Sequence, residues 1–298
     1  MNEQGLDVSE HERAVERYYA EATPGFYIRG WHADHIHFGL FEAGECPEEG
    51  ESLPESAGLA RAVERMIDEI VAPAGIGEND HVVDAGCGIG GTAMYLARTR
   101  GCRVTGVNVC RHQLEIAGQK VVDSGLHDRI GFEYGDCSRH LPFADDSVDA
   151  VVNIESACHY SDRGQFLREV RRILKPGGRI AAMDWLECDG LTDEQHDKFI
   201  RPMFDPWTVV GLESRSTYAR RLRETGLAVI EVEGFDGRDA CNVRLIGRSC
   251  RLLTILWFSG MKSDAHRGLM DRMGTLYAAW HGGYFELGRY CAEKPCNA

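Results

Sequence analysis

The spacing of apolar positions changes along the chain. Near the N-terminus, apolar residues recur at helical intervals over residues 10–21 and again over 56–71. From about residue 81, short apolar runs alternate with helical segments. We expect strands at 81–84, 103–109, 130–134, 148–154 and 179–184. We expect helices between these strands at 92–100, 112–124 and 165–174.

Strands separated by helices at this spacing are typical of a parallel sheet with helices on both faces. We therefore predict an α/β fold, a Rossmann-like, doubly wound, mostly parallel sheet with an N-terminal helical cap and a substrate-covering insertion. The alternation is interrupted at 191–215, a candidate lid. It resumes with a helix at 217–225, a strand at 228–234, an aromatic-rich segment and a last strand at 284–291.

Composition narrows the range of partners. The 298 residues carry a formal net charge of −14, which argues against nucleic acid and anionic membrane surfaces as partners. There is no apolar run of 18 residues and no apolar N-terminal leader, so we expect no membrane span and a cytoplasmic protein. The 11 cysteines include no CxxC pair, and we expect them to be reduced, small apolar residues.

A glycine-rich turn follows the first predicted strand of the alternating region. Asp84 precedes Gly86, Gly88 and Gly90, and the turn opens a helix. By itself this spacing is a weak signal, but its position is where a doubly wound sheet binds a nucleotide-like ligand. A dinucleotide pyrophosphate needs a loop without negative charge. The carboxylate of Asp84 suits a cationic ligand instead, and S-adenosylmethionine carries an ammonium and a sulfonium.

From Asp80 to Asp189 the chain resembles the class I S-adenosylmethionine-dependent methyltransferases. The likeness includes Asp136, where the family places an acidic residue near the adenine amino group, and the LKPGG turn at 174–178. The resemblance implies S-adenosylmethionine as cofactor. The cofactor-binding residues that we expect are Asp84, Gly86, Gly88, Gly90, Asn108, Val109, Gln113, Asp136, Cys137 and Asn153.

The second strand departs from the common pattern of this family. Most members have Asp or Glu at its end, whereas this chain has Asn108 and then Gln113. Amides also donate and accept hydrogen bonds at a ribose. The pattern is similar to a subgroup that contains cyclopropane fatty acid synthases and the sterol, tocopherol and geranyl diphosphate C-methyltransferases, which favours a carbon acceptor.

Glu155 follows the fourth strand, where class I enzymes direct residues at the transferring methyl group. Methylation of an alkene leaves a carbocation, and a carboxylate serves it as counter-charge and as general base. A Glu of this segment has that role in the related isoprenoid and sterol enzymes, and Glu155 aligns with it. Alternatively, Glu155 caps the following helix or holds the methionine ammonium.

His159 in the same segment has two interpretations. It is a base for a hydroxyl or amine acceptor, or a packed histidine bonded to a nearby carbonyl. The string ESACHY at 155–160 also resembles the matching segment of macrolide-sugar O-methyltransferases. Oxygen methylation therefore remains an alternative to carbon methylation.

The segment Tyr27–Leu40 resembles the HIHFG segment of the tocopherol, sarcosine and sterol methyltransferases, which folds over the cofactor. The spacing of its histidines does not fit one helix face, so we expect no metal. Aromatic residues there and later suit an apolar acceptor pocket, with core packing as the alternative for about half of them. The substrate-binding candidates are Tyr19, Tyr27, Trp31, His37, Phe204, Trp207, Trp257 and Tyr284. A diphosphate-bearing acceptor needs cations, for which Arg29, Arg215, Arg220, Arg244, Arg248 and Arg251 are available.

The resemblance divides the chain into a cap over the active site at 1–73, a cofactor-binding core at 74–190, and a lid with the closing strands at 191–298. We predict methyl transfer to a small, fairly apolar metabolite of specialised metabolism, preferably carbon methylation of an isoprenoid or other alkene-like acceptor. The alternative is O- or N-methylation of a hydroxyl or amine metabolite, such as a natural-product sugar or phenol. The sequence leaves open a homo-oligomer.

Overall fold

A seven-stranded sheet forms the centre of the molecule. The computed structural model describes residues 10–260 and 264–296. The strand order is β3-β2-β1-β4-β5-β7-β6, and β7 runs antiparallel to both of its neighbours while the other pairs are parallel. The strands are β1 His81–Ala85, β2 Arg103–Asn108, β3 Ile130–Tyr134, β4 Val148–Ile154, β5 Leu174–Glu187, β6 Ala228–Gly234 and β7 Phe285–Glu293. The predicted α/β fold class is therefore confirmed.

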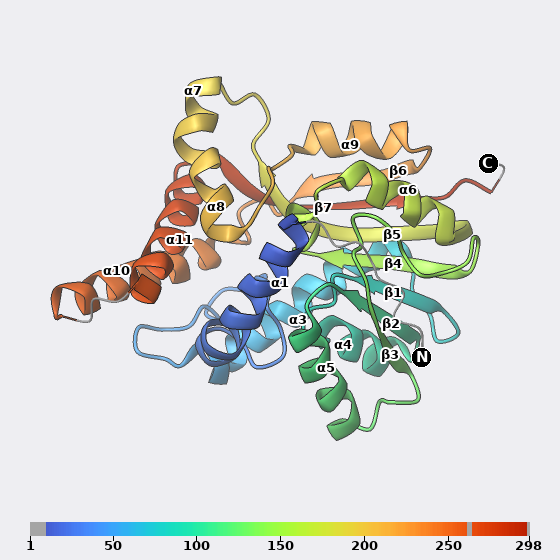
Figure 1. The fold of residues 1–298 in the computed structure, drawn as a ribbon, viewed down its shortest axis with the longest axis horizontal. Coiled ribbons are helices and arrows are strands. Elements are labelled where there is room, and N and C mark those ends of the chain that lie inside the picture. Colours follow the sequence, from blue (N-terminus) through green and yellow to red (C-terminus); the bar gives the residue numbers. More distant parts are fainter. Residues whose placement is uncertain (1–9, 261–263, 297–298) are drawn as a thin grey trace.

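Helices cover both faces of this sheet. The helices are α1 Glu10–Ala22, α2 Ile28–Gly30, α3 Ala57–Val71, α4 Gly91–Arg100, α5 Arg111–Asp123, α6 Arg163–Ile173, α7 Asp193–Gln195, α8 Phe204–Trp207, α9 Arg215–Glu224, α10 Ala240–Phe258 and α11 Asp264–His281. Short 3-10 or π turns occupy Thr23–Tyr27, Leu53–Glu55, Ala72–Ala74, Ala157–His159, His196–Ile200 and Arg201–Met203. Figure 1 shows α6 and α9 on one side of the sheet and α4 and α5 on the other.

Two buried clusters explain why the strands are apolar almost throughout. Successive residues of a strand point to opposite faces, so a strand covered on both sides needs apolar side chains at every position. Val82 of β1 belongs to the cluster that includes α3 and α4, and Val83 belongs to the cluster that includes α6 and α9. Because β1 to β5 run parallel, their carboxyl ends lie together at one edge of the sheet.

The cap helix α1 crosses in front of this edge (Figure 1). Glu12 accepts hydrogen bonds from the hydroxyls of Ser138 and Ser161, and Thr23 accepts one from the side-chain amide of Gln113. The segment that follows α1 also contacts helix α5, because Asp34 forms an ion pair with Lys120 of that helix. Polar contacts therefore fix the N-terminal segment over the ends of β2, β3 and β4.

The aromatic-rich segment after β6 folds as a helical hairpin, which the sequence patterning did not predict. Helices α10 and α11 pack against each other and extend away from the sheet (Figure 1). Leu252, Ile255 and Phe258 of α10 are exposed. No helix within the described ranges is long and apolar enough to cross a membrane.

One cysteine pair corrects the expectation of reduced thiols throughout. Cys46 of the N-terminal segment and Cys241 of α10 form a disulfide across 195 residues of sequence. The other nine cysteines are free. No sequence pattern indicates this pair, because only the fold brings the loop after Leu40 beside α10. Asn242, next to Cys241, bonds to the backbone of Gly39 at the same contact.

Candidate active site

A cavity opens at the carboxyl edge of the sheet, beneath α1. It encloses about 1530 Å³, including the part open to solvent. Its walls come from the ends of β1, β2 and β4, the segment 26–38, and helices α10 and α11.

The glycine-rich turn forms the floor of the cavity. Gly86 has φ +79°, and a Cβ at this position would lie 1.8 Å from Oγ of Ser156. Gly88 has φ +54° and also lines the cavity. Only glycine adopts these conformations without strain, and the missing side chains expose the backbone to a ligand.

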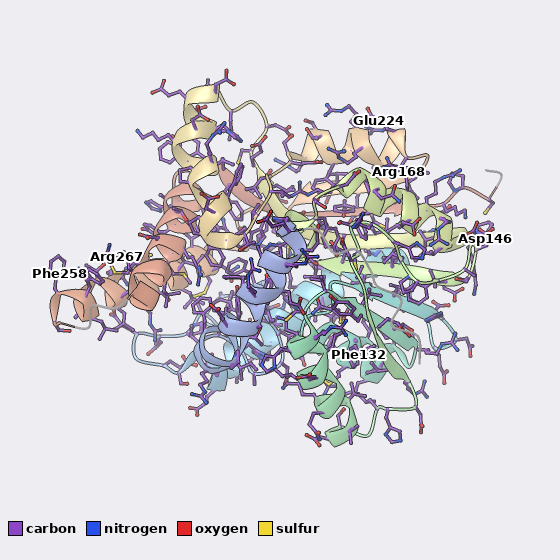
Figure 2. The ribbon with its side chains drawn as sticks, in the orientation of Figure 1. Phe132, Asp146, Arg168, Glu224, Phe258 and Arg267 are labelled. Carbon is purple, nitrogen blue, oxygen red and sulfur yellow. A yellow bond between two sulfur atoms is a disulfide. The ribbon has the colours of Figure 1, made fainter. Side chains whose placement is uncertain are left out.

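Gly90 has a packing role instead of facing the ligand space. It is the N-cap of α4 with φ +81°, and it is not among the lining residues. A Cβ there would lie 3.0 Å from Cζ of Phe132, a β3 residue labelled in Figure 2. Gly90 thus lets α4 approach β3 closely.

Asp84 provides a buried carboxylate at the end of β1. Burial raises the pKa of this carboxyl to about 7. Its Oδ2 has no hydrogen-bond partner among the described residues, and Asp84 lines the cavity. A nearby cation would stabilise the ionised form of this buried carboxyl group. The expected cofactor carries such a positive charge.

Asn108 and Gln113 lie together in the cavity wall. The side-chain amide of Asn108 donates to Oε1 of Gln113 at 2.7 Å, and its Oδ1 accepts from the backbone N–H of Val109 at 3.0 Å. Gln113 in turn donates to Thr23. The two amides therefore connect β2 and α5 to the cap, and Asn108, Val109 and Gln113 all line the cavity.

Asp136 and Cys137 follow β3 and line the same cavity. Burial raises the pKa of Asp136, whose Oδ1 accepts from the backbone of Ser138 and whose Oδ2 lacks a partner among the described residues. Burial raises the pKa of the Cys137 thiol to about 12, so this cysteine stays protonated. Asn153, by contrast, lies behind the cavity, where its amide donates to the carbonyl of Ala85 at 2.7 Å.

Glu155 stands at the end of β4 in the left-handed region, with φ +49°. Its Oε1 accepts from the backbone N–H of Phe38 at 2.7 Å, and its Oε2 accepts from Nε1 of Trp185 at 2.8 Å. Despite these donors, burial raises the pKa of Glu155 to about 8. The carboxyl group joins the N-terminal segment, β4 and β5 at the cavity wall.

His159 is held between two partners. Its Nδ1 lies 3.0 Å from the carbonyl oxygen of Thr208, and its Nε2 lies 2.9 Å from the hydroxyl of Tyr19. A carbonyl oxygen only accepts, so Nδ1 carries the proton and Nε2 accepts from the tyrosine hydroxyl. Burial lowers the pKa of His159 to about 4, which keeps the ring neutral near pH 7. Both His159 and Tyr19 line the cavity.

The aromatic candidates divide into two groups. Those that line the cavity are Tyr19, Tyr27, Trp31, His37 and Trp207. Three of the candidates, Phe204, Trp257 and Tyr284, are not among the lining residues, and core packing was the alternative for about half of the aromatics. Tyr284 stacks on Phe199 at 4.0 Å, and Phe204 packs against His196. The guanidinium of Arg267, far out on the hairpin in Figure 2, lies 5.3 Å from the ring of Trp257.

Several lining residues were not singled out by sequence reasoning. They are contributed by the ends of strands and by the hairpin, and include Trp185, Ile246, Ser249, Met273 and Leu276. Trp185 follows the buried Asp184 at the carboxyl edge of the sheet. Ligands of α/β sheets bind at this edge, so the position of Trp185 in the sequence carried a signal that it lines the site. The hairpin residues carried none, since only the tertiary fold directs α10 and α11 to the site.

The charge of the cavity lining is one-sided. Among the described residues, the lining includes Glu12, Asp34, Asp84, Asp136 and Glu155 but no lysine or arginine. Three of the proposed arginines have acidic partners elsewhere: Arg215 pairs with Glu286, Arg220 with Glu224 and Arg251 with Glu49. Within the described ranges, no three His, Cys, Asp or Glu side chains are grouped to hold a metal ion.

Comparison with known proteins identifies a family of methyltransferases. Residues 83–182 match the model of the methyltransferase domain family. The chain is 35% identical to the methyltransferase GfsG of Streptomyces halstedii over 78% of each protein, and 33% identical to an O-methyltransferase of Pyrenophora dematioidea over 67% of this chain and 70% of that one. Geranyl diphosphate C-methyltransferase from Streptomyces coelicolor A3(2) has the same fold, with a TM-score of 0.69 and 19% identity over 96% of this chain and 98% of that one.

The fold and the site define a class I methyltransferase. The chain belongs to the S-adenosylmethionine-dependent methyltransferase family, and S-adenosylmethionine is its cofactor. The cavity fits this group, because Asp84 near the end of β1 and Asp136 after β3 both line it, and each keeps a buried carboxylate oxygen without a partner among the described residues. The acceptor is a small molecule.

Proposed function

We propose that this enzyme methylates a hydroxyl oxygen of an uncharged, largely apolar small molecule. The observation that carries the proposal is the fixed tautomer of His159. Thr208 holds the proton on Nδ1, so the Nε2 lone pair is directed at the hydroxyl of Tyr19 in the cavity wall. A base oriented by a third group in this way is the common arrangement for activating a hydroxyl nucleophile.

The lining supports an uncharged acceptor. Aromatic rings of Tyr27, Trp185 and Trp207 provide apolar contact area, and the described lining offers no cation for a phosphate. An anionic acceptor would lie in this buried site without a lysine or arginine side chain beside it, which is unfavourable. These features disfavour an isoprenoid diphosphate, the acceptor class that the sequence pattern first suggested.

Tyr19 and His159 account for the proton that the acceptor hydroxyl loses in this reaction. When bound, S-adenosylmethionine supplies an electrophilic methyl group on its sulfonium. The acceptor oxygen would receive this methyl group beside Tyr19, with S-adenosylhomocysteine as the leaving group. Tyr19 accepts the proton of the acceptor hydroxyl while passing its own proton to Nε2 of His159, and the carbonyl of Thr208 stabilises the resulting imidazolium. S-adenosylhomocysteine and a methyl ether are the products.

We infer that Asp84 balances the positive charge of the cofactor, with Gly86 and Gly88 giving close backbone contact. Asn108, Val109 and Gln113 would contact the ribose, and Asp136 and Cys137 the adenine. In this arrangement Asn153 and Gly90 support the floor from behind. The cofactor's methyl group would then face Tyr19, Glu155 and His159, which share the remaining wall.

Carbon methylation with Glu155 as base is the second candidate. The aromatic lining and the buried carboxylate favour it, since both stabilise a developing carbocation. It ranks second because a carboxyl with a pKa of about 8 is mostly protonated at pH 7, and because two N–H donors already engage its oxygens. A neutral His159 is ready to accept a proton at the same pH.

Product analysis with isotope-labelled S-adenosylmethionine tests the proposal. The acceptor panel comprises phenols, sugars and aliphatic alcohols, with sterols, isoprenoid diphosphates and amines as competitors. Methyl ethers should dominate, and His159→Ala should lower turnover by roughly 10²- to 10⁴-fold while Glu155→Gln retains more activity. C-methylated products with the reverse order of the two variants would establish the second candidate instead.

A further inference from the structure

A second histidine in the cavity has an unused hydrogen-bond acceptor. Nδ1 of His37 lies 2.9 Å from the carbonyl oxygen of Phe38, so this nitrogen carries the proton. Nε2 is then the unprotonated nitrogen with a free lone pair. This atom is buried and has no partner among the described residues, while His37 itself lines the cavity and is 7% exposed.

The position of His37 is fixed from several directions. Nε1 of Trp31 donates to the His37 carbonyl at 3.0 Å, and the ring of His35 lies 5.0 Å away. The next residue, Phe38, donates its N–H to Glu155 and packs against Trp185 and Trp280. The imidazole is therefore a preorganised part of the wall, beside the groups that we assign to methyl transfer.

A buried acceptor without a partner is costly in a native structure, so such an atom in a cavity wall calls for a partner that enters the cavity. The cofactor's ammonium has a better partner in the carboxylate of Asp84, whose Oδ2 is also free among the described residues. A neutral imidazole instead suits a neutral O–H donor. Among the described residues, His37 forms no hydrogen bond with Tyr19 or His159, so it does not duplicate the base.

We infer that Nε2 of His37 accepts a hydrogen bond from a second hydroxyl of the methyl acceptor, one that is not methylated. The inference rests on the proposed function and narrows its substrate class to apolar molecules that carry at least two hydroxyl groups. His37 selects these molecules and orients them toward Tyr19. Acceptors with a single hydroxyl leave the lone pair buried and unpaired, and bind more weakly.

Binding to the enzyme saturated with S-adenosylhomocysteine tests this role without turnover. The probes are matched pairs that differ by one hydroxyl, catechol against guaiacol and a vicinal decanediol against decanol, measured by calorimetry. The wild type should prefer the diols by roughly 10- to 100-fold. His37→Phe should abolish the preference, and His37→Gln, which keeps an acceptor at the end of the side chain, should restore part of it.

His81→Phe is the matched control, because His81 lies at the start of β1 and bonds to Thr105 outside the cavity. It should leave the diol preference and the affinity for S-adenosylhomocysteine unchanged. If His37→Phe does not fold, nitrogen NMR of the wild-type imidazole gives an independent readout, because the Nε2 signal should shift when a diol is added.

Three results would overturn the inference: no diol preference in the wild type, a preference that survives in His37→Phe, or a loss of affinity for S-adenosylhomocysteine in that variant. The last would place the cofactor at His37. Failure of the proposed function has a different signature, since it would appear as missing methyl ethers in the turnover assay while these binding measurements stand.

Discussion

The backbone N–H of Phe38 donates a 2.7 Å hydrogen bond to Glu155, although the two residues are 117 positions apart. The same carboxylate accepts from Trp185. One side chain thus joins the segment beneath the cap to two strands of the sheet. A buried N–H that loses its acceptor is unfavourable, so the contact stabilises the closed cavity.

We expect Glu155→Ala to release the segment 31–40. Hydrogen exchange at the Phe38 amide should become markedly faster, because both donors lose their acceptor. Glu155→Gln should give an intermediate rate, since one carbonyl oxygen remains. Glu133→Gln, an exposed position on β3, serves as the control. Equal exchange rates in all variants would show that the contact does not hold the segment.

The dependence of turnover on pH should identify the base. With His159, the neutral form is the active one, so the rate should be flat between about pH 6 and 9 and fall as the pH approaches the pKa of about 4. With Glu155, the ionised form is needed, so the rate should rise through the pKa of about 8. Circular dichroism across the range separates titration from unfolding.

Cofactor affinity should depend on Asp84. Its pKa of about 7, raised by burial, means that part of the population is protonated at neutral pH, and a bound cation favours the ionised form. Binding of S-adenosylmethionine should therefore tighten as the pH rises through 7 and release protons. In Asp84→Asn the affinity should be at least about tenfold weaker and lose this pH dependence. Calorimetry in buffers of different ionisation enthalpy measures both quantities.

The raised pKa of Asp84 also affects folding. Without cofactor, the folded state keeps a proton that the unfolded chain releases above its ordinary pKa, so stability falls between about pH 4 and 7. Asp84→Asn removes this loss and should stabilise the ligand-free protein by about 1–3 kcal/mol at pH 8. At pH 5 the gain in the free energy of unfolding of Asp84→Asn should be smaller. Urea unfolding at both pH values measures it.

The disulfide between Cys46 and Cys241 should contribute to stability. A cross-link over a long loop restricts the unfolded chain, and removing it typically costs about 2–4 kcal/mol. The double substitution to serine should lower the free energy of unfolding by that amount, and dithiothreitol should bring the wild type to the same value. Cys296→Ser, at an exposed free thiol, should change nothing. A wild type insensitive to the reductant would contradict this.

Gly86 should tolerate no side chain. Gly86→Ala places a Cβ against Ser156 at a positive φ, so we expect lost cofactor binding together with destabilisation of about 1–3 kcal/mol. Gly118→Ala in α5 is the control, because nothing lies within 4 Å of a Cβ there. Chemical denaturation should show an unchanged or slightly higher free energy of unfolding for this variant, as expected for alanine in a helix.

The strand and helix order could be predicted from sequence because it depends on local periodicity. Apolar runs of a two-sided parallel sheet and the glycine-rich turn after Asp84 are visible residue by residue, and they indicated the fold and the cofactor. The strand β6 has the predicted bounds, and β1 to β4 differ by a residue at most. The helices α10 and α11 were missed because their aromatic positions gave no clear helical repeat.

What only the tertiary structure decided are the contacts between distant segments. The sequence marked Glu155 and His159 but not their partners, and those partners determine their chemistry. Thr208 fixes the tautomer of His159, Phe38 and Trp185 engage Glu155, and the hairpin closes a cavity whose described lining has no cation. Hydrogen-bond direction and burial depend on positions in space, which residue types along a chain do not specify.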